Sequence, residues 1–150
     1  GYDIVDPHRV SDGLGGKGEL QLLRTALRKR GMGEMLDIVP NHLAVGGREN
    51  RWWWDVLAQG PASPYAHYFD IDWNPPDPTL RGRLLVPLLS GHYGRLVGTG
   101  EIRLVRDGAG VEVGYLEWRL PLSARSVIQL LQLAGQRLGL ADPALTAAVM

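Results

Sequence analysis

Apolar residues recur at helical spacing in an early segment of the chain. Within residues 18–30, Leu20, Leu23 and Leu27 lie three or four positions apart, while basic residues occupy the other faces. Gly31 follows directly, and glycine is common just past the last turn of a helix. The pattern therefore predicts an amphipathic helix over residues 18–30.

A short apolar run, residues 35–39, comes soon after this helix and is typical of a strand covered on both faces. Pro40 has no N–H, so it ends the pairing of such a strand. Residues 1–15 are rich in glycine, proline and aspartate, as expected of a loop that leaves an earlier strand. Loop, helix and buried strand in this order predict an αβ unit of a parallel sheet.

The pattern changes at residue 46. Residues 46–78 hold seven of the eleven aromatic residues and end in a run of proline and aspartate, which predicts a long irregular excursion. Residues 84–120 alternate between apolar and polar positions, with turn residues at 107–110. This alternation predicts a small antiparallel sheet that contains a hairpin.

Two helices are predicted towards the C-terminus. Within residues 123–139, one helical face collects apolar side chains: Val127, Leu130, Leu131, Ala134 and Leu138. Asp142 followed by Pro143 is typical of the capped start of a further helix. The chain begins with Gly1 and stops within the first turns of that last helix, so we expect both ends to be cuts through a longer protein.

The charge of the chain is balanced. Lys plus Arg and Asp plus Glu number 16 each among 150 residues, which argues against a nucleic-acid or anionic-membrane partner. The absence of cysteine excludes disulfides, thiolate metal sites and cysteine nucleophiles, and it fits a reducing compartment, so we expect a cytoplasmic protein. No run approaches the roughly 20 apolar residues needed to cross a bilayer.

The residues after the predicted strand are candidates for a functional site. Asn41 and His42 follow Pro40 at the carboxyl end of the strand, where the loops of a parallel α/β fold converge. Asp37, inside the strand, is placed to orient them. The alternative is that Asp37 caps a neighbouring helix and His42 is a structural histidine; from these residues both interpretations stay open.

Two other stretches carry possible chemistry. The glycine-rich residues 13–18 precede a helix, so they are either a phosphate cradle or a turn that starts the helix. The missing Gly-Lys-Ser/Thr ending of a P-loop favours the turn. The aromatic residues of 51–57, with Tyr65, Tyr68, Phe69 and Trp73, either stack on sugar rings or bases, with neutral charge favouring sugar, or form the core of a subdomain. We expect most of them to be core.

Several of these stretches resemble the α-amylase superfamily, the glycoside hydrolases and transglycosylases built on a (β/α)8 barrel. "DIVPNH", residues 37–42, resembles the signature of the third barrel strand, and "GYDIVDPHRVSDGLGG" resembles the segment after the second strand. "WWWDVLAQGPASPYAHYFDIDW" is similar to the trehalose-forming members of that superfamily. The resemblance covers residues 1 to about 122.

The resemblance implies an α/β fold: part of a (β/α)8 TIM barrel, from the end of strand 2 to strand 3, followed by an inserted α+β subdomain and truncated at both ends. Residues 1–42 are then part of the catalytic barrel. Residues 43–140 are the subdomain inserted after barrel strand 3, and residues 141–150 are the start of a truncated helix.

The activity implied by the resemblance is an intramolecular transglucosylation. The reducing-end α-1,4 linkage of a maltooligosaccharide is converted to an α-1,1 linkage, in trehalose biosynthesis. Retaining chemistry of this kind uses two carboxyls about 5–5.5 Å apart, which the family takes from later strands. We therefore expect no catalytic residue in this chain and no activity in the isolated chain. Alternatives are another hydrolase or glucosyltransferase of the superfamily, or a non-catalytic carbohydrate-binding module.

The resemblance also assigns substrate-binding residues. Tyr2 matches an aromatic platform under the sugar, and His42 matches a histidine that hydrogen-bonds the hydroxymethyl group of that sugar. Asp37 matches an acidic residue that organises its neighbours. Asn41 matches a position that helps to hold calcium in many amylases, but companion oxygen ligands are missing, so we expect no metal. We expect no cofactor and no partner beyond a maltooligosaccharide substrate, with the oligomeric state left open.

Overall fold

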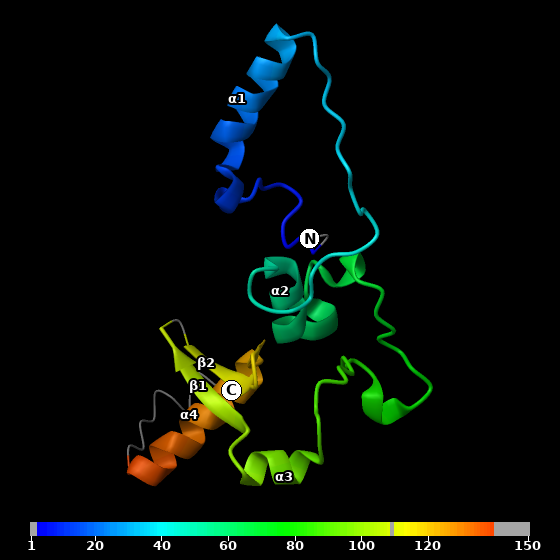
Figure 1. The fold of residues 1–150 in the computed structure, drawn as a ribbon. Coiled ribbons are helices and arrows are strands. Elements are labelled where there is room, and N and C mark those ends of the chain that lie inside the picture. Colours follow the sequence, from blue (N-terminus) through cyan, green and yellow to red (C-terminus); the bar gives the residue numbers. More distant parts are fainter. Residues whose placement is uncertain (1–2, 109, 140–150) are drawn as a thin grey trace. The chain divides into compact units, whose positions relative to one another are not determined.

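The computed structural model describes residues 3–108 and 110–139 (Figure 1). By its internal contacts the chain divides into two units, Gly1–Arg51 and Trp52–Met150. Tyr2 and the helix predicted from Asp142 lie outside the described residues. No helix among the described residues combines the length and the apolar character that crossing a bilayer requires.

The first unit is built around one helix. A short 3-10 turn, η1 (Asp12–Leu14), leads into α1 (Gly16–Lys29). Gly15 has φ 91°, and a Cβ there would lie 2.2 Å from Cγ of Glu19, so only glycine fits this turn. The glycine-rich residues 13–18 therefore form the turn that starts the helix, which was the favoured interpretation.

The C-terminal end of α1 is closed by a Schellman motif. Gly31, at φ 66°, donates its N–H to the carbonyl of Arg28, and Met32 donates to the carbonyl of Leu27. The predicted helix is thus confirmed, with its start two residues earlier than expected. Its end falls where the glycine indicated.

The strand predicted over residues 35–39 does not form. This segment is extended but has no strand assignment, and its apolar side chains face solvent, with Met35 97% exposed. A buried parallel strand is stabilised by neighbouring strands and by helices on both faces. The described residues of the first unit contain no strand to pair with it, so the apolar pattern is present without the ladder that it predicts.

The second unit begins with a helix that the sequence pattern did not predict. Residues 46–78 were expected to be irregular, but α2 spans Arg51–Gln59 and buries Trp53 and Val56. Three 3-10 turns follow: η2 (Gly60–Ala62), η3 (Ala66–Tyr68) and η4 (Pro78–Leu80). Tryptophan and β-branched residues are weak helix formers, so this helix depends on the packing of its buried face.

A three-stranded antiparallel sheet forms the middle of the second unit. Its strands are β1 (Ile102–Asp107), β2 (Gly110–Tyr115) and β3 (Trp118–Pro121), in the order β1-β2-β3. Asp107 pairs with Gly110 across the hairpin, so the predicted sheet and turn are confirmed. The prediction is wrong for residues 84–101, which form no strand. Part of this stretch is instead the helix α3 (Tyr93–Gly98), in which Leu96 is completely buried.

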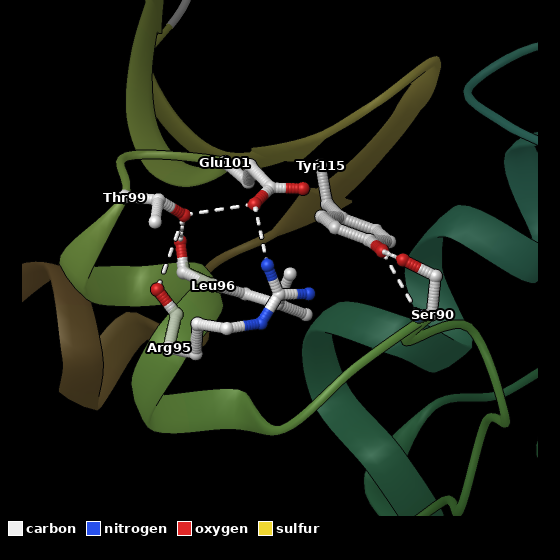
Figure 2. A network of polar contacts seen from close by, with 6 residues as sticks. All are labelled: Ser90, Arg95, Leu96, Thr99, Glu101 and Tyr115. Atoms are coloured by element: carbon white, nitrogen blue, oxygen red, sulfur yellow. Dashed lines mark hydrogen bonds and ion pairs between the residues drawn. The ribbon is translucent and has the colours of Figure 1, made fainter.

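A polar network joins α3 and the preceding segment to the sheet (Figure 2). The buried Tyr115 hydroxyl accepts the Ser90 N–H at 3.0 Å and lies 2.6 Å from Ser90 Oγ. At the other end of α3, the Thr99 hydroxyl lies 2.8 Å from a carboxylate oxygen of Glu101, which is itself 3.7 Å from an Arg95 nitrogen. The first contact ties the segment before α3 to β2, and the second ties the end of α3 to the residue before β1.

The second predicted helix is confirmed as α4 (Ala124–Leu138). The Ser123 side chain accepts the N–H of Ser126 at 3.2 Å and caps the first turn. Gly139, at φ 66°, ends the helix. Much of the expected apolar face stays open to solvent, as the exposure of Leu131 and Leu138 shows.

Candidate functional site

The two polar residues after Pro40 lie together, as predicted. Nδ1 of His42 is 3.2 Å from Oδ1 of Asn41, and both side chains are exposed. With this amide oxygen as the acceptor, His42 carries its proton on Nδ1 and presents the lone pair of Nε2 outwards. The pair can therefore accept a hydrogen bond from a hydroxyl group of a ligand.

The loop after His42 is held by a buried asparagine. The Asn50 side chain donates to the carbonyl of Ala44 at 2.8 Å, and Asn50 is only 1% exposed. Sequence reasoning missed this contribution of Asn50. The one signal was its position, because asparagine directly before a helix is a common capping residue.

The N-terminal segment lies beside the same loop. The N–H of Ala44 donates to the carbonyl of Ile4 at 2.9 Å. Ala44 comes two residues after His42, and Ile4 comes two residues after Tyr2. The backbone thus brings together the two stretches from which the predicted sugar-binding residues come, although the position of Tyr2 itself lies outside the described residues. Asp37 is exposed in the extended segment before Pro40.

An ion pair of the first unit joins the middle of α1 to the segment that follows the helix. Nε and Nη2 of Arg24 contact the two carboxylate oxygens of Glu34 at 2.7 and 3.0 Å, a bidentate arrangement. The hydrogen bond from Arg24 holds the pKa of Glu34 below its ordinary value, and Glu34 raises the pKa of Arg24. The pair borders an open hollow of about 410 Å³ beside α1 and links the helix to the segment that contains Glu34.

Within residues 3–108 and 110–139, no group of three or more histidine, aspartate or glutamate side chains is placed to hold an ion. The amide oxygen of Asn41 contacts the ring of His42 and acts as its hydrogen-bond acceptor.

The aromatic residues of the second unit divide into two groups. Trp53 is buried and packs on Phe69, with ring centroids 5.0 Å apart. Trp52 instead stacks with Tyr65 at 6.1 Å and lies 5.3 Å from Tyr68. Tyr68 is 55% exposed. The expectation that most of these rings are core is therefore wrong, because only Trp53 is buried. Trp52, Tyr65 and Tyr68 form a cluster that reaches the surface.

One buried serine organises the loop that carries the two tyrosines. The hydroxyl of Ser63, a residue 5% exposed, donates to Oδ1 of Asp55 on α2 and accepts the N–H of Tyr65 at 3.1 Å. The Tyr68 N–H then donates to the Tyr65 carbonyl at 3.0 Å. Hydrogen bonds thus hold both tyrosines in a fixed relation to α2.

Comparison with known proteins gives concordant matches. The family described as "Alpha amylase, catalytic domain" matches residues 1–88. Proteins from two strains of Mycobacterium tuberculosis, provisionally named maltooligosyl trehalose synthase, are 45% identical over 124 residues, which is 76% of this chain and 16% of theirs. The chain thus spans about one sixth of the length of these curated relatives.

Solved structures of similar proteins cover most of the chain. A crystal structure of maltooligosyl trehalose synthase is 34% identical with a TM-score of 0.69, and the match covers 81% of this chain and 16% of that one. The structure of maltooligosyltrehalose synthase from Arthrobacter ramosus is 44% identical with a TM-score of 0.67, covering 83% of this chain and 15% of that one.

Proposed function

Because the chain belongs to the alpha-amylase family, we propose that it is a segment of a maltooligosyl trehalose synthase. The observation that carries this proposal is the agreement between a solved synthase at 44% identity, matched over 83% of this chain, and curated relatives of the same name at 45%. The family and the solved synthases imply a TIM-barrel-type fold for the protein to which the segment contributes.

We further propose the division of the segment within that fold. Residues 1–42 run from the end of barrel strand 2 to strand 3, and residues 43–140 form the subdomain inserted after strand 3. The exposed apolar run 35–39 supports this assignment, because it has the composition of a barrel strand and gains its partners only inside a closed barrel. The position of α1 directly before that run supports it as well.

The proposed reaction is the conversion of the reducing-end α-1,4 linkage of a maltooligosaccharide to α-1,1, an isomerisation that forms a trehalose end. The catalytic carboxylates come from barrel strands outside these 150 residues, so the isolated chain is inactive. Trehalose formation in the cytoplasm is the corresponding cellular role, and the neutral charge of the chain suits an uncharged sugar. We propose no cofactor.

Within that reaction, the chain binds the sugar. Nε2 of His42 accepts a hydrogen bond from the hydroxymethyl group, while Asn41 keeps the ring in the tautomer that makes this possible. Tyr2 supplies the ring on which the sugar stacks, and Asp37 organises the neighbouring groups. The backbone link between Ile4 and Ala44 supports a common location for Tyr2 and His42.

Product analysis tests this function. In a chimera, the chain replaces the matching segment of the Arthrobacter ramosus synthase, and the chimera is incubated with maltopentaose. We expect reducing ends to disappear without release of glucose. A rise in reducing ends would instead identify a hydrolase of the same family. A folded chimera that binds maltopentaose and leaves it unchanged would favour a non-catalytic binding module.

A further inference from the structure

We propose that Trp52, Tyr65 and Tyr68 form a second sugar-contacting surface, an aromatic platform for an α-1,4-glucan chain that is distinct from the His42 subsite. This inference rests on the proposed function, because that function defines the class of ligand. The three residues are called the platform below.

The rings of the platform are close enough to act as one surface. The Tyr65 and Tyr68 centroids are 6.0 Å apart, and each ring also contacts Trp52, at 6.1 and 5.3 Å. His67 adds a further exposed ring 4.3 Å from Tyr68. Aromatic residues normally bury most of their area, yet Tyr68 is 55% exposed. A cluster of this kind on a surface is typical of a binding site.

The polar groups of the platform suit a sugar better than an apolar partner. In the part of the chain that the structure describes, the hydroxyl groups of Tyr65 and Tyr68 have no hydrogen-bond partner. A tyrosine ring can cover the apolar face of a pyranose while its hydroxyl group bonds to the sugar hydroxyls.

The platform is also preorganised. Trp52 is fixed on α2, and this helix is anchored by the buried Trp53 and Val56. Tyr65 and Tyr68 are held to α2 through the hydrogen bonds of Ser63 to Asp55 and to the Tyr65 N–H. A ligand that binds here therefore meets rings already in place, which lowers the entropy lost on binding. A loop that served only as a connection needs no such clamp.

Titration of the 150-residue chain with maltopentaose tests the proposal. NMR signals of the Tyr65 and Tyr68 rings report binding at the platform. We expect both rings to shift, Tyr68→Ala to weaken binding about 3- to 10-fold, and Tyr68→Phe to bind better than Tyr68→Ala. Tyr115→Phe is the matched control, because Tyr115 is buried elsewhere in the unit. Cellopentaose, with β-1,4 linkages, is expected to bind more weakly.

A second measurement uses the chimera described above. Tyr68→Ala is expected to raise KM for maltopentaose with little change in kcat, because it removes binding that the ground and transition states share. Ring signals that do not move in a chain with a dispersed spectrum overturn the proposal. So does a variant chimera with a lower Tm and an unchanged KM, since that result assigns Tyr68 to packing against another part of the protein.

The two proposals fail separately. Synthase products from a chimera whose platform does not bind the glucan would remove the platform and leave the proposed function. Hydrolytic products from a chimera whose platform binds the glucan would remove the proposed function and leave the platform.

Discussion

The clamp formed by Ser63 predicts a large effect from a small substitution. In Ser63→Ala the hydroxyl that donates to Asp55 is lost, and so is the acceptor of the Tyr65 N–H. A hydrogen bond to a charged group contributes about 1.5–3 kcal/mol and a neutral one about 1 kcal/mol. Because Ser63 is buried, water replaces these contacts poorly. We expect the free energy of unfolding of the second unit to fall by about 2–4 kcal/mol.

Tryptophan fluorescence during urea unfolding measures this effect selectively. All five tryptophans of the chain, Trp52, Trp53, Trp54, Trp73 and Trp118, belong to the second unit. With a denaturant dependence of about 2 kcal/mol per molar urea, the midpoint should fall by about 1–2 M, or the unit should be unfolded before urea is added. Ser63→Thr keeps the hydroxyl group and is expected to retain most of the stability.

A free energy of unfolding for Ser63→Ala within about 0.5 kcal/mol of the wild-type value, the range of an ordinary surface substitution, would show that these hydrogen bonds do not stabilise the unit. That result would mean that the loop of Tyr65 and Tyr68 is held without the serine. The geometry of the platform would then have another origin.

Two further predictions concern single contacts. Arg24→Gln should raise the pKa of Glu34 towards its ordinary value, and NMR titration of the carboxyl carbon can measure this change. In the wild-type chain the pair stabilises the fold above the ordinary glutamate pKa, and this contribution is lost as the pH falls through the lowered pKa. An unchanged titration of Glu34 in the variant would contradict the pairing. Gly114→Ala should destabilise the sheet by about 1–3 kcal/mol in the fluorescence assay, because its Cβ would lie 2.7 Å from a methyl carbon of Val105. A Cβ at Gly110 would meet nothing within 4 Å, so Gly110→Ala should be nearly neutral. Equal losses of stability in the two variants would contradict the register of the strands.

Elements with local causes were predictable from the sequence. The leucines of α1, its C-terminal Gly31 and the hairpin at residues 107–110 each act within a few positions of the chain. For such elements the pattern contains nearly all of the information. The N-terminal cap of α4 at Ser123 belongs to the same group.

Elements that depend on distant partners were not predictable. Residues 35–39 have the composition of a buried strand, but a strand forms only beside another strand, and the described residues of the first unit supply none. The helix α2 was missed for a related reason, because its tryptophans have modest helix propensity. Packing of Trp53 on Phe69 stabilises it instead.

The candidate site shows the same division. Asn41 and His42 are adjacent in sequence and were found from the residue types that follow a predicted strand end. The contacts that hold their loop, from Asn50 and from Ile4 to Ala44, join residues 6 and 40 positions apart. No short motif encodes them. The split between core and platform likewise depends on tertiary contacts, because Trp53 packs on Phe69 while Trp52 packs on Tyr65 and Tyr68.

We propose that this chain holds the sugar while groups elsewhere break its bond. Steady-state kinetics of the chimera with maltopentaose tests it most directly, with His42→Ala compared against His92→Ala, an exposed histidine outside the proposed site. We expect His42→Ala to lower kcat/KM about 10-fold and His92→Ala to leave it unchanged. Equal values of kcat/KM for the two variants would contradict the claim.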